Sequence, residues 1–146
     1  MIQNKKFEYL EWRSLDQMHF DSVEWLSELN FIADELLFLE DLLKEYFIQL
    51  SSKQQYPKAK SLVDALTESK DKVKELIVQV QRHNNDLSVL TDNEDQPYEE
   101  REVKAAHREM LTETNNYFQK FKALKKNIFI LVSNIMKHDR AKRLLN

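Results

Sequence analysis

Apolar residues recur at alternating spacings of three and four along most of the chain, which predicts helices packed along a common seam. The pattern occupies three stretches, separated by two polar segments that each end in proline. The first stretch comprises Leu15, Met18, Ser22, Trp25, Leu29, Ile32, Leu36, Leu39, Leu43, Tyr46 and Leu50. The second comprises Leu62, Leu66, Ser69, Val73, Leu76, Val80, His83, Leu87 and Leu90. The third comprises Met110, Thr114, Tyr117, Phe121, Leu124, Ile128, Leu131, Ile135 and His138, and the same register run back one heptad from Thr114 includes His107.

The polar segments and a capping pattern predict where these helices begin and end. Pro57 and Pro97 suit the first turn of a helix, because the N–H that proline lacks has no partner there. Ser14 and Gln17 have the spacing of a capping box. We therefore expect helices at about 14–51, 57–91 and 97–143. Short connections make consecutive helices antiparallel, so the predicted fold is all-α: an up-down-up bundle of three long helices in one domain, 1–146.

The first thirteen residues do not continue the seam of the first helix. In that register Glu8 and Glu11 would fall on the apolar side. Residues 1–13 are therefore expected to form a short separate helix or an arm.

The composition supports helices and excludes several classes of chemistry. The chain has 146 residues and contains no Gly and no Cys. Without Gly, a sheet with tight hairpins, a dinucleotide-binding crossover and a P-loop are all disfavoured. Without Cys there is no disulfide, thiol catalysis or Cys-based metal site. The longest apolar run, 128–132, has five residues, whereas a membrane-spanning helix needs about 20. We expect a soluble, cytoplasmic protein.

Antiparallel pairing across the two connections predicts which residues lie at the same level. It places His83 opposite about residue 105, hence close to His107, with Glu28 at nearly the same height. Two imidazoles and a carboxylate inside a helical bundle can bind a metal ion. No Glu stands three residues before a His, so the di-metal carboxylate pattern is absent. Hydrogen-bonded core histidines are the alternative, and if they are neutral, stability falls as pH drops below about 6.5.

Charge is unevenly distributed along the sequence. Residues 1–50 carry a net charge of −7, whereas 119–146 carry +7. The same level matching, with an offset of about 80 residues between the first and third helices, pairs Lys120–Lys126 with Glu40–Tyr46. The acidic residues of the first helix would then neutralise this basic stretch, which argues against nucleic-acid binding. The basic end remains, and it could bind an acidic partner or membrane surface, or simply suit a helix C-terminus; its residues are Lys137, Arg140, Lys142 and Arg143.

Apolar residues outside the seam exceed what three helices need for one core. They are Leu37, Phe38, Phe47 and Ile48 on the first helix, and Phe118, Phe129, Ile130 and Val132 on the third. They predict an interface with a second copy or a helical partner; the alternative is a wider core in the same chain. The leading hypothesis is a non-enzymatic interaction or structural module. The alternatives are a metal-binding bundle protein using His83, His107 and Glu28, and acidic-surface binding through the basic end.

Overall fold

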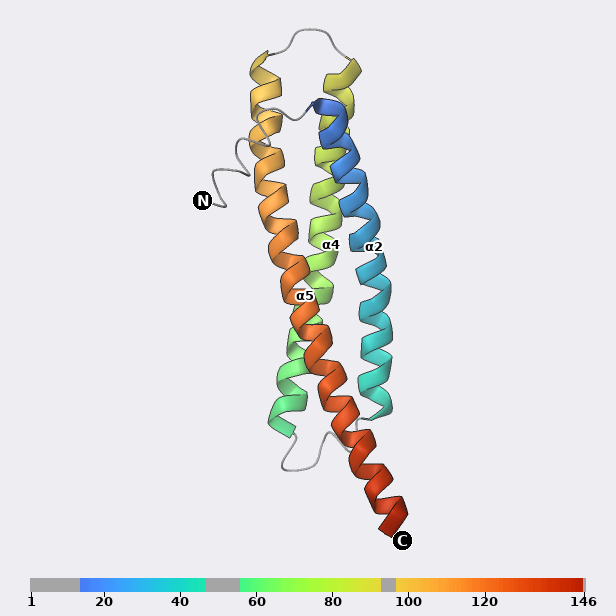
Figure 1. Ribbon diagram of the computed structural model, residues 1–146. Helices are drawn as coiled ribbons and strands as arrows, with labels where there is room; N and C mark the ends of the chain where they lie inside the picture. The colour runs from blue at the N-terminus through green and yellow to red at the C-terminus, as the bar shows by residue number, and fades with distance from the viewer. Residues whose placement is uncertain (1–13, 47–55, 93–96, 146) are drawn as a thin grey trace, which may run out of the picture. The chain divides into compact units, whose positions relative to one another are not determined.

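The computed structural model describes residues 14–46, 56–92 and 97–145, and these form three long helices. Helix α2 spans Leu15–Glu45, α4 spans Tyr56–Asp92 and α5 spans Pro97–Leu145. Consecutive helices run antiparallel, so α2 and α5 point the same way (Figure 1). The described ranges contain no strand. The predicted all-α antiparallel bundle of three long helices is confirmed.

The helix ends follow the local signals in the sequence. The Ser14 N–H donates to Gln17 Oε1 and the Gln17 N–H donates to Ser14 Oγ, both at 3.2 Å, so the predicted capping box forms. Pro57 lies in the first turn of α4, and Pro97 is the first residue of α5. The predicted continuation of the first helix to 51 and the arm 1–13 lie outside the described residues.

Contacts group the chain into two compact units. Unit 1 comprises Met1–Phe31 and Lys74–Tyr117, and unit 2 comprises Ile32–Val73 and Phe118–Asn146. Each of the three helices contributes one stretch to each unit. A single domain over 1–146 stays a prediction.

The interior of unit 1 mixes apolar and polar side chains. Its buried apolar residues are Met18, Trp25, Leu29, Leu76, Val80, Leu87, Leu90 and Tyr117. Four polar side chains are buried among the described residues of this unit, namely Ser22, His83, His107 and Thr114. All twelve occupy positions of the predicted seam.

The interior of unit 2 is hydrocarbon and aromatic throughout its described part. It consists of Ile32, Leu36, Leu39, Leu43, Ala59, Leu66, Val73, Phe118, Phe121, Leu124, Ile128, Leu131, Val132 and Ile135. Burial along α5 ends at Ile135, and the next predicted seam residue, His138, is exposed. The sequence pattern therefore extended the seam too far, because a heptad position is buried only where a partner helix covers it.

In the described part of the chain, no helix combines the length and the apolar character that crossing a membrane requires.

Candidate functional site

A polar centre in unit 1 brings together side chains from all three helices. We define it as Asp21 and Ser22 of α2, His83 and Asn84 of α4, and His107 of α5. Both histidines lie on the predicted seam and are buried, His107 completely. His83 Nε2 lies 2.7 Å from His107 Nδ1, so the predicted proximity of the two imidazoles is confirmed.

The hydrogen-bond partners assign a tautomer to each ring. Asp21 Oδ2 lies 3.2 Å from His107 Nε2, and an ionised carboxylate can only accept, so His107 donates from Nε2. In neutral His107, Nδ1 then carries a lone pair and accepts from His83 Nε2–H. The result is a chain of donors from α4 through α5 to α2. This arrangement requires both imidazoles to be neutral, with one N–H on each ring.

Neighbouring side chains fix the positions of these hydrogen-bonded groups. Trp25 stacks on the His107 ring, with centroids 4.8 Å apart and an interplanar angle of 26°. The Ser22 hydroxyl lies 2.8 Å from the His19 carbonyl oxygen and 2.7 Å from Asn84 Oδ1. The contact between Ser22 and Asn84 links α2 directly to α4 next to the histidines. A buried polar cluster connected in this way favours one arrangement of the three helices.

Burial keeps His83 neutral. Desolvation, reinforced by the neighbouring His107, lowers the pKa of His83 from 6.5 to about 4. At neutral pH the ring is therefore an uncharged hydrogen-bond donor. This agrees with the tautomers that the geometry assigns.

The residues predicted to bind a metal do not all meet. Glu28 is exposed, and its predicted place beside His107 is taken by Asp21. Zinc bound tetrahedrally at about 2.0–2.1 Å from each of two ring nitrogens separates them by about 3.3 Å, wider than the observed 2.7 Å. Over the described ranges, no three His, Cys, Asp or Glu side chains are grouped so that they could hold a metal ion. The polar centre as it stands is a hydrogen-bonded pair with a carboxylate, not a ligand shell.

The level matching failed between the two parallel helices and succeeded between antiparallel neighbours. His83 meets His107 as expected, but Asp21 and His107 are 86 positions apart, and Glu35 and Lys125 are 90 apart. The expected offset of about 80 was the sum of two antiparallel alignments, so it combines the errors of both. The sequence did carry one usable signal for Asp21, its place next to the seam residue Ser22.

One lysine of the basic stretch 120–126 of α5 is paired with an acidic residue of α2, but not with one of the expected residues. Lys125 Nζ donates to both carboxylate oxygens of Glu35, at 2.9 and 3.2 Å. Glu40 instead binds Lys70 of α4 and, at 3.2 Å, Lys44 of its own helix. The pKa of the Glu40 carboxyl is lowered by hydrogen bonds from Lys70 and Lys44. All these pairs lie within unit 2.

Most of the predicted interface residues that the structure describes are exposed. Leu37, Phe38, Phe129 and Ile130 all present large apolar side chains to solvent. Phe118 and Val132 are different: both are buried in the core of unit 2, so the prediction that they lie outside the core was wrong. Each directly follows a seam residue, Tyr117 or Leu131. The buried side of a bundle helix can include this third position of the seven-residue repeat next to the two seam positions. Phe47 and Ile48 lie outside the described residues, and the exposed Met136 was not predicted.

The four residues of the basic end are exposed along the last turns of α5, at positions 137, 140, 142 and 143. Lys142 and Arg143 occupy the last turn, where positive charge stabilises the negative end of the helix dipole.

Comparisons with protein-family models, with curated proteins and with solved structures found no match.

Proposed function

We propose that this chain is a non-enzymatic helical interaction module that associates with a second copy through the outer surface of α2 and α5 in unit 2. The observation that carries the proposal is the exposure of large apolar side chains on both helices: Phe38 is 58% exposed and Phe129 is 43% exposed. Exposed aromatic side chains grouped on one surface are typical of protein–protein contacts.

Helix geometry places these residues on one face. Glu35 and Lys125 form an ion pair between the parallel helices α2 and α5. Phe38 lies three residues after Glu35, and Phe129 lies four residues after Lys125, so each is the next neighbour of the pair along its helix surface. Met136 follows Phe129 by seven residues, on the same side of α5. We call Phe38, Phe129 and Met136 the outer face.

The charges beside the outer face favour a second copy as the occupant. A two-fold dimer brings identical patches together, so an unpaired charge close to the two-fold axis would meet its own like charge. Here the adjacent Glu35 and Lys125 are paired with each other within one chain. Association of two such faces buries apolar surface while this ion pair stays intact within each chain.

A single charged substitution tests the proposal. Phe38→Glu adds a charge to the outer face at an exposed position, so the helix content should be unchanged while the dimer dissociates. Val78→Glu is the matched control, because Val78 is 47% exposed on α4 and lies outside this face. We expect light scattering to give a lower mass for Phe38→Glu and the wild-type mass for Val78→Glu. Equal masses for both variants and the wild type would contradict the proposal.

A second proposal is supported by the exposed basic end of α5. Its four cations have one acidic neighbour, Asp139, along the final turns of the helix, so they would attract an acidic surface. Binding to vesicles that contain anionic lipid should then weaken as salt rises and should require Lys142 and Arg143. Vesicle binding that is insensitive to salt would contradict it. With the leading proposal we infer a cytoplasmic location, in keeping with a chain that lacks Cys.

A further inference from the structure

A pocket of about 460 Å³ lies in unit 2 between the end of α2 and the start of α4. This volume falls within the range of about 300–1,000 Å³ that is usual for small-molecule sites. On α4 the lining residues recur at helical spacing, from Tyr56 through Val63 to Lys70, so one face of four turns forms one wall. On α2 the lining comes from Glu40, Leu43 and Lys44. This is not the outer face, which lies beside the contact between α2 and α5.

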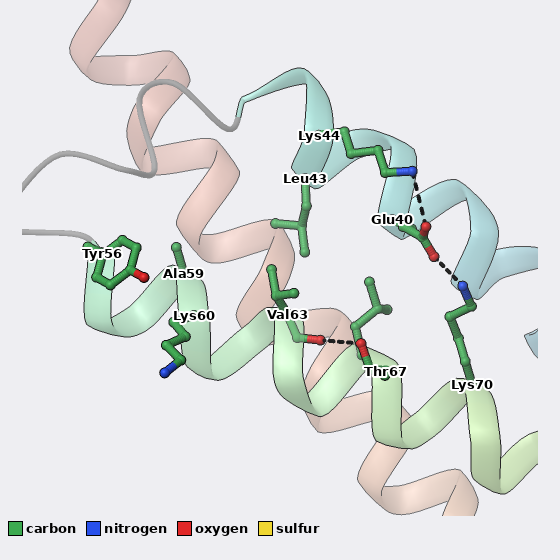
Figure 2. A pocket seen from close by; sticks show the side chains of 10 residues that line it. Glu40, Leu43, Lys44, Tyr56, Ala59, Lys60, Val63, Thr67 and Lys70 are labelled. Carbon is green, nitrogen blue, oxygen red and sulfur yellow. Dashed lines mark hydrogen bonds and ion pairs between the residues drawn. The ribbon is translucent and has the colours of Figure 1, made fainter.

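The floor of the pocket is apolar. Figure 2 shows Leu43 of α2 pointing toward Val63 and Ala59 of α4. Leu66 adds a further buried side chain to the lining. Val63 remains 41% exposed and Tyr56 is also exposed, so the described residues leave apolar surface open to a ligand. The Thr67 hydroxyl donates to the Val63 carbonyl at 3.0 Å, so its proton is already used within the helix.

One end of the pocket has excess positive charge. Glu40 accepts from both Lys70 and Lys44, so two ammonium groups share one carboxylate (Figure 2). The Glu40 carboxylate is ionised at neutral pH, and the two lysines lower its pKa further, so the cluster carries one net positive charge. A second carboxylate beside the cluster would complete the pairing of charges. It would gain charge-assisted hydrogen bonds that are stronger than neutral ones.

We propose that this pocket binds an amphipathic anion, a medium-chain alkyl carboxylate whose tail lies over Leu43, Ala59 and Val63 and whose head group meets Lys44 and Lys70. The apolar floor selects for the alkyl tail, and the excess positive charge selects for the sign of the head group. A long groove along one helix wall suits an extended chain better than a compact ring. This inference is independent of self-association, since it uses neither Phe38 nor Phe129.

Three probes that share a ten-carbon chain separate the contribution of the tail from that of the head group. They are decanoate, decanol and decyltrimethylammonium, each used below its critical micelle concentration. By isothermal titration calorimetry, we expect decanoate to bind at least tenfold more tightly than decyltrimethylammonium. Methyl NMR shifts on decanoate binding should centre on Ala59, Val63 and Leu43. Equal affinity for the anion and the cation would overturn the proposal. Failure of decanoate to bind would also overturn it, and is the result expected if another part of this chain or a second copy fills the pocket.

Matched variants locate the site. Val63→Glu places a carboxylate over the floor and should weaken decanoate binding at least tenfold, whereas Val78→Glu, on the same helix outside the pocket, should leave it unchanged. Lys70→Gln should weaken decanoate binding and leave decanol binding as it was. If Val63→Glu and Val78→Glu have the same effect, the ligand binds elsewhere and the proposal is wrong.

Discussion

The two units use the same seam pattern to build different interiors. In unit 1 the seam carries Ser22, His83, His107 and Thr114, and hydrogen bonds link all three helices at its centre. In unit 2 every buried residue of the described part is apolar, and ion pairs lie at the margins. The stability of unit 1 should therefore depend on the protonation state of His83, whereas that of unit 2 should depend on how well hydrocarbon fills space.

The difference also bears on register. An apolar seam tolerates small shifts of one helix against another, because one aliphatic contact resembles the next. A hydrogen bond between His83 and His107 forms at one register only, and a slip would leave buried polar groups without partners. We infer that the polar centre fixes the alignment of the three helices in unit 1.

The largest effect is expected from removing hydrocarbon in unit 2. Leu36 is fully buried, so Leu36→Ala should lower the free energy of unfolding by about 2–5 kcal/mol, measured by urea denaturation. The loss should be the same at pH 7.5 and pH 5, because no titrating group is involved. The adjacent Leu37 is exposed, and Leu37→Ala should change stability by no more than about 0.5 kcal/mol. Similar costs for the two substitutions would show that Leu36 is not in the core.

Acidification should weaken unit 1 by a smaller amount. Burial lowers the pKa of His83 to about 4 in the folded chain, from the ordinary value of 6.5 that applies to the unfolded chain. Because burial favours the neutral ring, its contribution is complete above pH 6.5 and is lost as pH falls toward 4. Between pH 7.5 and 5 we expect a loss of about 1–2 kcal/mol, allowing for some solvent screening. Hydrogen exchange should show lower protection in 74–92 and 97–117 first.

The control for this pH dependence removes the titrating group. His83→Leu should be less stable than the wild type at pH 7.5, because His107 Nδ1 loses its donor. The gap between the two proteins should narrow at pH 5. A wild-type melting temperature that is flat over this pH range, or a gap that stays constant, would mean that the imidazoles do not control the stability of unit 1.

The smallest effect is expected at the margin of unit 2. Glu40→Gln removes the carboxylate shared by Lys44 and Lys70. Ion pairs that are partly open to solvent contribute little, so unfolding should become easier by less than about 1 kcal/mol, and added salt should reduce the difference. Asp41→Asn, on the exposed neighbouring position, provides the matched control. A loss above 2 kcal/mol would show that this cluster is a structural element in its own right.

The helices and the histidine pair could be predicted from local information. Spacings of three and four identify the buried side of each helix, and antiparallel neighbours joined by one short connection can be aligned with small error. That was sufficient to bring His83 and His107 together. The predicted seam failed at His138, where the helix continues but the core does not.

Other features depend on three-dimensional information that the spacing does not contain. Asp21, rather than Glu28, reaches His107 because the offset between parallel helices depends on both connections. Phe118 is buried because the core of unit 2 is wider there than a two-position seam. The pocket depends on the small side chain of Ala59 and on where α2 ends relative to the start of α4. None of these features follows from the three-and-four spacing of the seam.

Self-association through the outer face can be measured from the mass of the untagged wild-type chain in solution. Sedimentation equilibrium over a dilution series at neutral pH and moderate salt should show a species of twice the 17.6 kDa chain mass. That species should give way to the single chain only on dilution, and salt should not disrupt it, because apolar contacts hold it together. A 17.6 kDa species at every concentration would contradict the account.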